Sequence, residues 1–206
     1  MFKKSLVFAF ALAATFSQAY VVVDKAPDLG EYWYPLGGTP IYSDSFIFSG
    51  NTGDSATVGG AYMRALGASP TTFQFLLLAD AGNAPSSSIL ASSAFTSTNS
   101  GSLTLVTGAL SANSLVNGTR YWLALSTVGG SGGDSYQMGG HTQNSIYNDN
   151  GTFWYSNAGD LNNWDGQALT PEMAIYVEAS PVPEPATMAA LGMGALALIR
   201  RKRKSA

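Results

Sequence analysis

The sequence predicts an all-β fold, a single antiparallel β-sandwich of jelly-roll type, over residues 20–180. Three observations lead to this fold class. Short runs in which apolar and polar residues alternate recur about every ten to twenty residues. Clusters of Gly, Asn and Asp, which favour turns, lie between these runs. No segment of the body has the apolar period of an amphipathic helix, so the crossovers that a parallel sheet needs are not expected.

Residues 1–19 have the form of a secretory signal peptide. Two lysines give a positively charged start, and residues 6–16 form an apolar stretch that is too short to span a bilayer comfortably. Small residues at Ser17 and Ala19 predict cleavage by signal peptidase between Ala19 and Tyr20. The alternative interpretation is an uncleaved anchor or a buried strand.

Within the body, seven runs are predicted as strands. Residues 72–78 are nearly all apolar, which is expected for a central strand that is buried on both faces. Residues 119–127 alternate most regularly, with Tyr121, Leu123 and Leu125 on one face. The runs are 45–48, 58–66, 72–78, 89–95 (the weakest), 102–110, 119–127 and 173–178.

The connections are predicted from their turn residues. Asn117 and Gly118 form a strong turn sequence, which we expect to close a hairpin between residues 103–110 and 119–127. Residues 85–102 are rich in Ser and Thr, and residues 128–133 are rich in Gly. Both stretches are therefore predicted as mobile surface loops, although the first includes the weak strand candidate.

The body is acidic and contains no cysteine. Twelve of the chain's 13 acidic residues fall in residues 20–182, against three of its 10 basic residues, namely Lys25, Arg64 and Arg120. Such a surface would repel phosphate backbones, so nucleic-acid binding is not expected. The lack of cysteine excludes disulfides, thiolate catalysis and cysteine-ligated metals. Stability must then come from packing, with bound calcium as a further source.

Aromatic residues are concentrated in a stretch rich in Gly and Asn, residues 136–164. Aromatic rings on such loops can stack on sugar rings, so Trp154, Tyr155 and Trp164 are candidates for polysaccharide binding. The alternative is that these rings cap the core of the sandwich. Neighbouring residues of a strand point to opposite faces, so Trp154 and Tyr155 are not expected to contact one ligand together.

The same stretch offers a calcium site and little catalytic chemistry. Asp149, Asp160 and Asp165 lie in oxygen-rich turns, and calcium takes about six to eight oxygen ligands. The alternative is that these aspartates stabilise their own turns. His141 is the single histidine, so a zinc site, which usually needs several nitrogen or sulfur ligands, is not expected. We expect no catalytic residue and no enzymatic activity, with a secreted glycan hydrolase or lyase as the alternative.

Residues 181–206 combine three parts in a fixed order. Pro183, Glu184 and Pro185 predict an extended tripeptide, because proline fixes φ and disfavours helix in the residue before it. Residues 186–199 carry no charge and predict a transmembrane helix of about 21 Å, shorter than a hydrocarbon core of about 30 Å. A basic cluster follows, which by the positive-inside rule stays in the cytoplasm while the body lies outside. The cluster consists of Arg200, Arg201, Lys202, Arg203 and Lys204.

In this order the three parts resemble the PEP-CTERM sorting signal of Gram-negative bacteria. The resemblance covers the final 24 residues. It implies processing by exosortase, a membrane-embedded cysteine transpeptidase, at or near the Pro-Glu-Pro site. The helix and the basic cluster would be removed, so the protein contacts the membrane only through that helix and only before processing. A permanent anchor without processing is the alternative.

The resemblance also implies a destination. The family is associated with bacteria that produce exopolysaccharide, so the body is expected at the cell surface or in the extracellular matrix of a biofilm. There it would have a structural or adhesive role, with extracellular polysaccharide as its partner.

Overall fold

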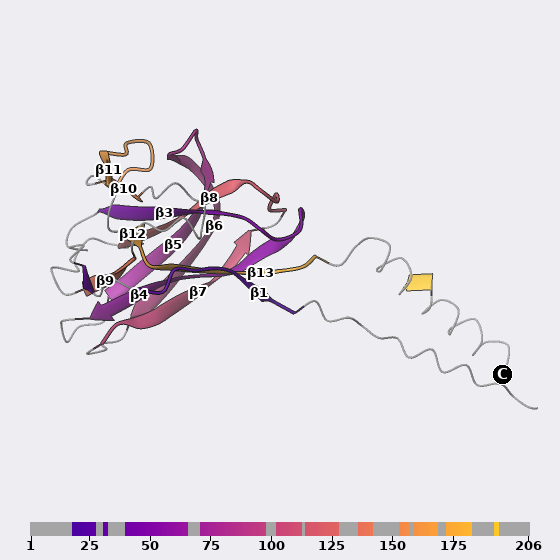
Figure 1. Ribbon diagram of the computed structural model, residues 1–206, viewed down its shortest axis with the longest axis horizontal. Helices are drawn as coiled ribbons and strands as arrows, with labels where there is room; N and C mark the ends of the chain where they lie inside the picture. The colour runs from indigo at the N-terminus through magenta and orange to yellow at the C-terminus, as the bar shows by residue number, and fades with distance from the viewer. Residues whose placement is uncertain are drawn as a thin grey trace, which may run out of the picture. The chain divides into compact units, whose positions relative to one another are not determined.

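Two antiparallel β-sheets form the body of the protein, which runs from Ala19 to Pro181 (Figure 1). Every regular element described within the body is a strand, so the all-β prediction is confirmed. The computed structural model describes residues 18–27, 31–32, 40–65, 71–97, 102–112, 114–127, 136–141, 153–156, 159–168, 172–182 and 192–193.

The chain passes repeatedly from one sheet to the other. The first sheet has the order β1-β13-β4-β9-β12, with β7 also paired to β4 and β2 to β9. The second has the order β11-β10-β3-β8-β5-β6. The strands are β1 (Tyr20–Asp24), β2 (Glu31–Tyr32), β3 (Ile41–Ile47), β4 (Ser55–Ala65), β5 (Thr71–Asp80), β6 (Pro85–Ser97), β7 (Thr104–Ala112), β8 (Arg120–Thr127), β9 (Tyr136–His141), β10 (Phe153–Ser156), β11 (Gly166–Ala168), β12 (Glu172–Met173) and β13 (Ile175–Ser180).

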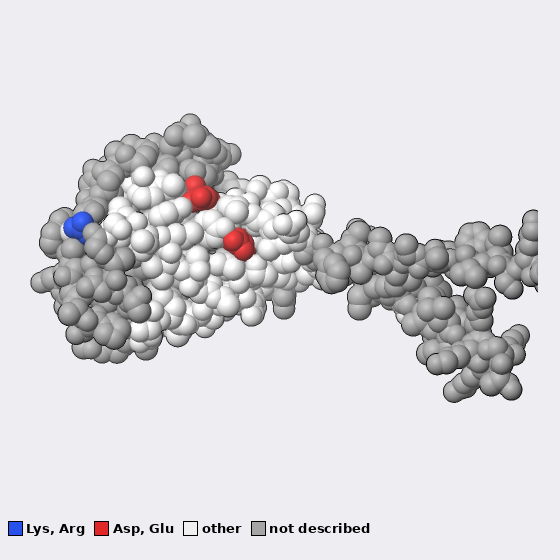
Figure 2. Space-filling view, turned by 90° about the horizontal axis from the view of Figure 1, so that it is seen from below, with Lys and Arg blue, Asp and Glu red and all other residues white. Residues whose placement is uncertain are grey.

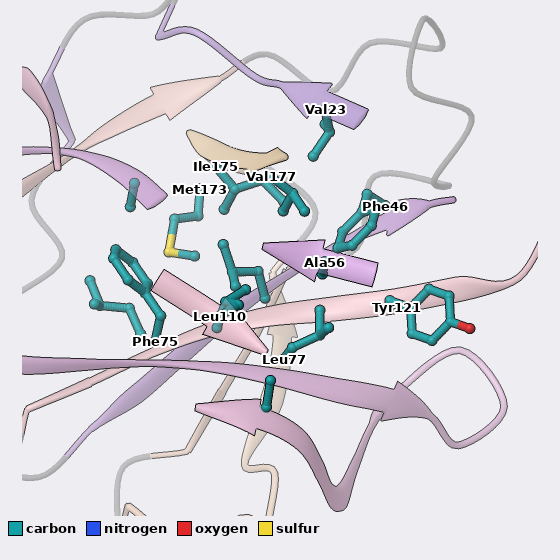
Figure 3. Close-up of a cluster of buried hydrophobic side chains, with 14 of the residues drawn as sticks. Val23, Phe46, Ala56, Phe75, Leu77, Leu110, Tyr121, Met173, Ile175 and Val177 are labelled. Carbon is teal, nitrogen blue, oxygen red and sulfur yellow. The ribbon is translucent and has the colours of Figure 1, made fainter. Parts of the chain in front are cut away.

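The main core lies between the two sheets (Figure 3). From the second sheet, β8 contributes Tyr121, Leu123 and Leu125, the face that the alternation of residues 119–127 predicts. From the first sheet, β13 contributes Ile175 and Val177, both with no exposed surface. Because side chains alternate across a strand, each sheet supplies one apolar face to this core.

A second apolar cluster lies on the outer face of the second sheet. It contains Leu76 and Leu78 of β5, Trp122 and Ala124 of β8, and Ile41 at the start of β3. Phe75 and Leu77, the neighbours in β5, belong to the main core. Strand β5 is therefore buried on both faces, as the apolar run at residues 72–78 predicts.

The prediction of a mobile loop at residues 85–102 is wrong for its first part. Strand β6 pairs with β5 from one end to the other and forms the edge of the second sheet. Phe95 holds it in place, because its ring stacks on Phe73 and Phe75 with centroid separations of 5.5 Å and 4.5 Å. Much of β6 is exposed to solvent, so serine and threonine are compatible with it, and Pro85 is tolerated at the first position of an edge strand.

The prediction of a hairpin at Asn117 and Gly118 is also wrong. A turn forms there, and Gly118 has a φ of 74°, which glycine adopts easily. However, β7 pairs with β4 in the first sheet, whereas β8 lies between β3 and β5 in the second. The amide of Gly118 donates to the carbonyl of Phe48 at 2.8 Å, so the turn carries the chain from one sheet to the other. Residues 128–133, the other predicted loop, lie outside the described residues.

Candidate functional site

The last strand of the body, β13, is hydrogen-bonded along its length as far as the start of the predicted sorting region, residues 181–206. Strand β13 is paired on both sides, with β1 and with β4, and its pairing ends at Ser180. Pro181 and the exposed Val182 follow. The hydrogen-bonded sheet therefore ends three residues before Pro183.

Most of the predicted sorting residues lie outside the described part of the chain. This holds for Pro183, Glu184 and Pro185 and for the basic residues 200–204. Of the predicted helix, Gly192 and Met193 are described, and both are exposed. Among the residues that the structure describes, no helix is long and apolar enough to cross a membrane.

The predicted signal-peptide cleavage site lies where the sheet begins. Ala19 is exposed, and Tyr20 opens β1 opposite Ala179 of β13. The hydroxyl of Tyr20 donates to Oδ2 of Asp54 at 2.6 Å. Burial, together with the hydrogen bond to Asp54 and its negative charge, raises the pKa of Tyr20 to about 12. Both predicted processing points therefore adjoin the same pair of strands, β1 and β13.

We expect the body to lose stability as the pH rises from about 10 to about 12. Tyr20 and Tyr176 both have a pKa raised to about 12, the latter chiefly through its hydrogen bond to Glu178. Between these pH values the two tyrosines keep their protons in the folded state and release them in the unfolded state. Their contribution to stability is therefore fully present below about pH 10 and is lost as the pH rises towards about 12. Urea denaturation across this range measures the effect. The variant with both tyrosines changed to Phe should show a flatter pH dependence, and an unchanged slope would contradict the assignment.

The structure brings two of the three candidate sugar-binding aromatics together. Trp154 of β10 and Trp164, in the segment between β10 and β11, pack with Leu161 against the outer apolar cluster. Tyr155 instead packs against the main core, because it is the next residue of the same strand. Trp154 and Trp164 are half-buried, so each keeps part of its ring surface in contact with solvent.

The described aspartates of this region stabilise the segment that carries the tryptophans. Oδ1 of Asp160 accepts hydrogen bonds from the backbone amide of Asn162 at 2.9 Å and from its side chain at 3.0 Å. The amide of Asp165 donates to the carbonyl of Tyr155 at 2.9 Å. Asp149 lies outside the described residues. Where the structure describes side chains, no group of three His, Cys, Asp or Glu residues is placed to hold a metal ion, and calcium binding stays a prediction.

A buried ionic cluster joins the two sheets, and the sequence analysis missed it. Nζ of Lys25 lies 3.1 Å from Oδ1 of Asp44 and 3.0 Å from Oε2 of Glu172, and all three side chains have zero exposed area. Lys25 follows β1, and its amide donates to the carbonyl of Ile175 at 2.8 Å. Glu172 opens β12 of the first sheet, whereas Asp44 belongs to β3 of the second.

Asp44 points into the main core. Its neighbours on the same face of β3 are Tyr42 and Phe46, both core residues. Oδ1 of Asp44 also accepts the backbone amide of Ser45 at 2.7 Å. Charged side chains are almost never fully buried unless they are paired. The sequence gives one weak indication of this cluster, which is that Lys25 is one of only three basic residues in the body.

Comparison with known proteins identifies the tail of the chain. Residues 181–204 match the family model of the PEP-CTERM protein-sorting motif. No curated protein matches the chain. The match confirms the resemblance drawn from the Pro-Glu-Pro tripeptide, the apolar run and the basic cluster, and it marks an exported protein that exosortase sorts to the cell surface.

Proposed function

We propose that this PEP-CTERM protein is a structural or adhesive component of the cell surface or extracellular matrix that associates with extracellular polysaccharide. Signal peptidase removes residues 1–19, and the helix at residues 186–199 holds the chain in the membrane. Exosortase then cuts near Pro183–Pro185 and releases the body, residues 20–180, to its destination in a biofilm matrix. The observation that carries the proposal is the sorting motif at residues 181–204.

The surface of the body supports a partner that is rich in hydroxyl groups. Figure 2 shows a face on which few described side chains are charged. The edge strands β6 and β7, which lie beside each other, expose mainly uncharged residues. Their exposed hydroxyl side chains are Ser87, Ser88, Ser92, Thr96, Thr104, Thr107 and Ser111. Such a surface can exchange hydrogen bonds with a hydrated glycan without burying charge.

The two tryptophans on the outer face supply the aromatic contact. Trp154 and Trp164 pack against the outer apolar cluster, and the turn at Asp160 orders the segment that leads to Trp164. A ring that is already held in position loses little conformational freedom when a sugar stacks on it. We therefore assign polysaccharide contact to the exposed parts of Trp154 and Trp164, and a structural role to Tyr155.

Affinity electrophoresis of the full chain in a gel containing the host's exopolysaccharide tests this proposal. The wild-type protein should be retarded, and Trp164→Ala should weaken binding by about tenfold, the value of one good aromatic contact. Leu161→Ala is the matched control, since Leu161 packs on the same cluster but offers no ring. No retardation of the wild type would contradict polysaccharide association. Sugar release during incubation would favour the hydrolase or lyase instead.

A further inference from the structure

The buried cluster of Lys25, Asp44 and Glu172 has the geometry of a reactive site. The amine of Lys25 lies 3.1 Å from one carboxyl group and 3.0 Å from the other, and none of the three side chains has any exposed surface. Groups held at this separation in a fixed orientation behave as if their concentration were far higher than any in solution. We propose that Lys25 and Asp44 become joined by an amide bond within the folded body, with Glu172 as the residue that transfers the protons.

Burial favours the protonation states that this reaction needs. Removal from water disfavours separate charges, so a proton shared between an amine and a carboxyl group shifts towards the neutral pair. A neutral amine has the free electron pair that attacks a carbonyl carbon, and an uncharged carboxyl group accepts such an attack. With one lysine and two carboxyl groups in the cluster, a second carboxylate remains to act as a base.

The hydrogen bonds assign the two carboxyl groups to different roles. Oδ1 of Asp44 accepts the backbone amide of Ser45 at 2.7 Å, so a fixed donor already faces the oxygen on which negative charge develops during attack. Oε2 of Glu172 accepts a hydrogen bond from Nζ of Lys25 at 3.0 Å. Glu172 is therefore placed to remove a proton from the attacking nitrogen.

The proposed step balances without any further reactant. Nζ of Lys25 attacks Cγ of Asp44, and an Nζ–Cγ bond forms while negative charge collects on Oδ1. Glu172 takes a proton from Nζ and passes it to Oδ2, the Cγ–Oδ2 bond breaks, and one water molecule leaves. The product is an amide, no atom changes oxidation state, and Glu172 returns to its starting form.

Such a bond would stabilise the body by a covalent cross-link, as disulfides stabilise many exported domains. The chain has no cysteine, so it cannot use a redox cross-link. The amide would join the end of β1, in the first sheet, to β3, in the second, across a sequence separation of 19 residues. A cross-link of this kind restricts the unfolded chain and ties the N-terminal strand to the opposite sheet.

Tryptic mapping of the denatured full chain tests the proposal directly. Lys25 is followed in the sequence by no other Lys or Arg until Arg64, and Asp44 lies between them. If the bond forms, trypsin cannot cut after Lys25, and the peptide that runs through Lys25 to Arg64 appears intact and one water lighter than its sequence. Fragmentation should place the bond between Lys25 and Asp44. Hydroxylamine should leave it unchanged, which distinguishes it from a succinimide within the same peptide.

Variants separate the roles of the three residues. Lys25→Arg and Asp44→Ala should lose the cross-link entirely, and Glu172→Gln, which keeps the shape of the side chain, should form it about a hundredfold more slowly. Full tryptic cleavage after Lys25, in wild-type protein that was folded first and then denatured for digestion, would overturn the proposal. A branched peptide that joins Lys25 to Glu172 would overturn the assignment of Asp44. An unchanged rate in folded Glu172→Gln would overturn the role of Glu172.

Discussion

Replacing Lys25 with methionine should lower the free energy of unfolding by about 3–5 kcal/mol. The side chain is fully buried between Asp44 and Glu172, and its Nζ atom donates to both. Methionine has a similar length but no amino group, so Asp44 and Glu172 would lose the partner they share in an environment that water does not reach. Urea denaturation followed by circular dichroism measures the change.

A triple variant is the matched control for this prediction. When Asp44→Leu and Glu172→Met accompany Lys25→Met, no buried charge remains, and most of the lost stability should return, because well-packed apolar residues often replace a buried ionic cluster at little cost. If Lys25→Met alone costs less than about 1 kcal/mol, the cluster does not hold the two sheets together as the structure indicates.

Replacing Trp122 with alanine should be similarly destabilising, by about 3–5 kcal/mol. Trp122 has no exposed surface and belongs to the outer apolar cluster, against which Trp154, Leu161 and Trp164 pack. Its indole group also donates to Oδ1 of Asp80 at 2.8 Å, which links β8 to the end of β5. The alanine variant would leave a cavity under the segment that carries the proposed polysaccharide contact.

A change in the tryptophan environment should accompany this loss. With Trp122 removed, the remaining tryptophans should become more accessible to acrylamide, which fluorescence quenching measures. Trp122→Phe is the control, since it fills most of the volume and loses the hydrogen bond to Asp80, at a cost of about 1–2 kcal/mol. Unchanged quenching in folded Trp122→Ala would show that the outer cluster does not support Trp154 and Trp164.

The pattern of apolar residues predicted the central strands correctly, through the alternation of residues 119–127 and the nearly continuous apolar run of residues 72–78. In β5 and β8 every second side chain enters the main core, and this periodicity is written in consecutive residues. Strands β1 and β10 were not predicted, for two different reasons. Tyr20–Asp24 adjoins the predicted signal peptide, and Phe153–Ser156 is short and surrounded by residues typical of turns.

Strand partners could not be predicted in the same way. The turn at Gly118 formed as its sequence indicates, yet the strands on either side of it joined different sheets. A turn reverses the chain locally, but the partner of a strand depends on which apolar faces can be buried together. Similarly, residues 85–97 have a composition common in loops and form a strand because β5 offers a hydrogen-bonding edge.

The all-β class of the body and the sorting motif of the tail can be read from the sequence alone. Both depend on residues that are close together along the chain: the twofold period of strands, and a linear peptide that an enzyme recognises as such. The pairing of the strands, the meeting of Trp154 with Trp164 and the cluster around Lys25 depend on how the chain folds in three dimensions. The two carboxylate partners of Lys25 are 19 and 147 positions away along the chain, and no local pattern predicts contacts that form when two sheets close on each other.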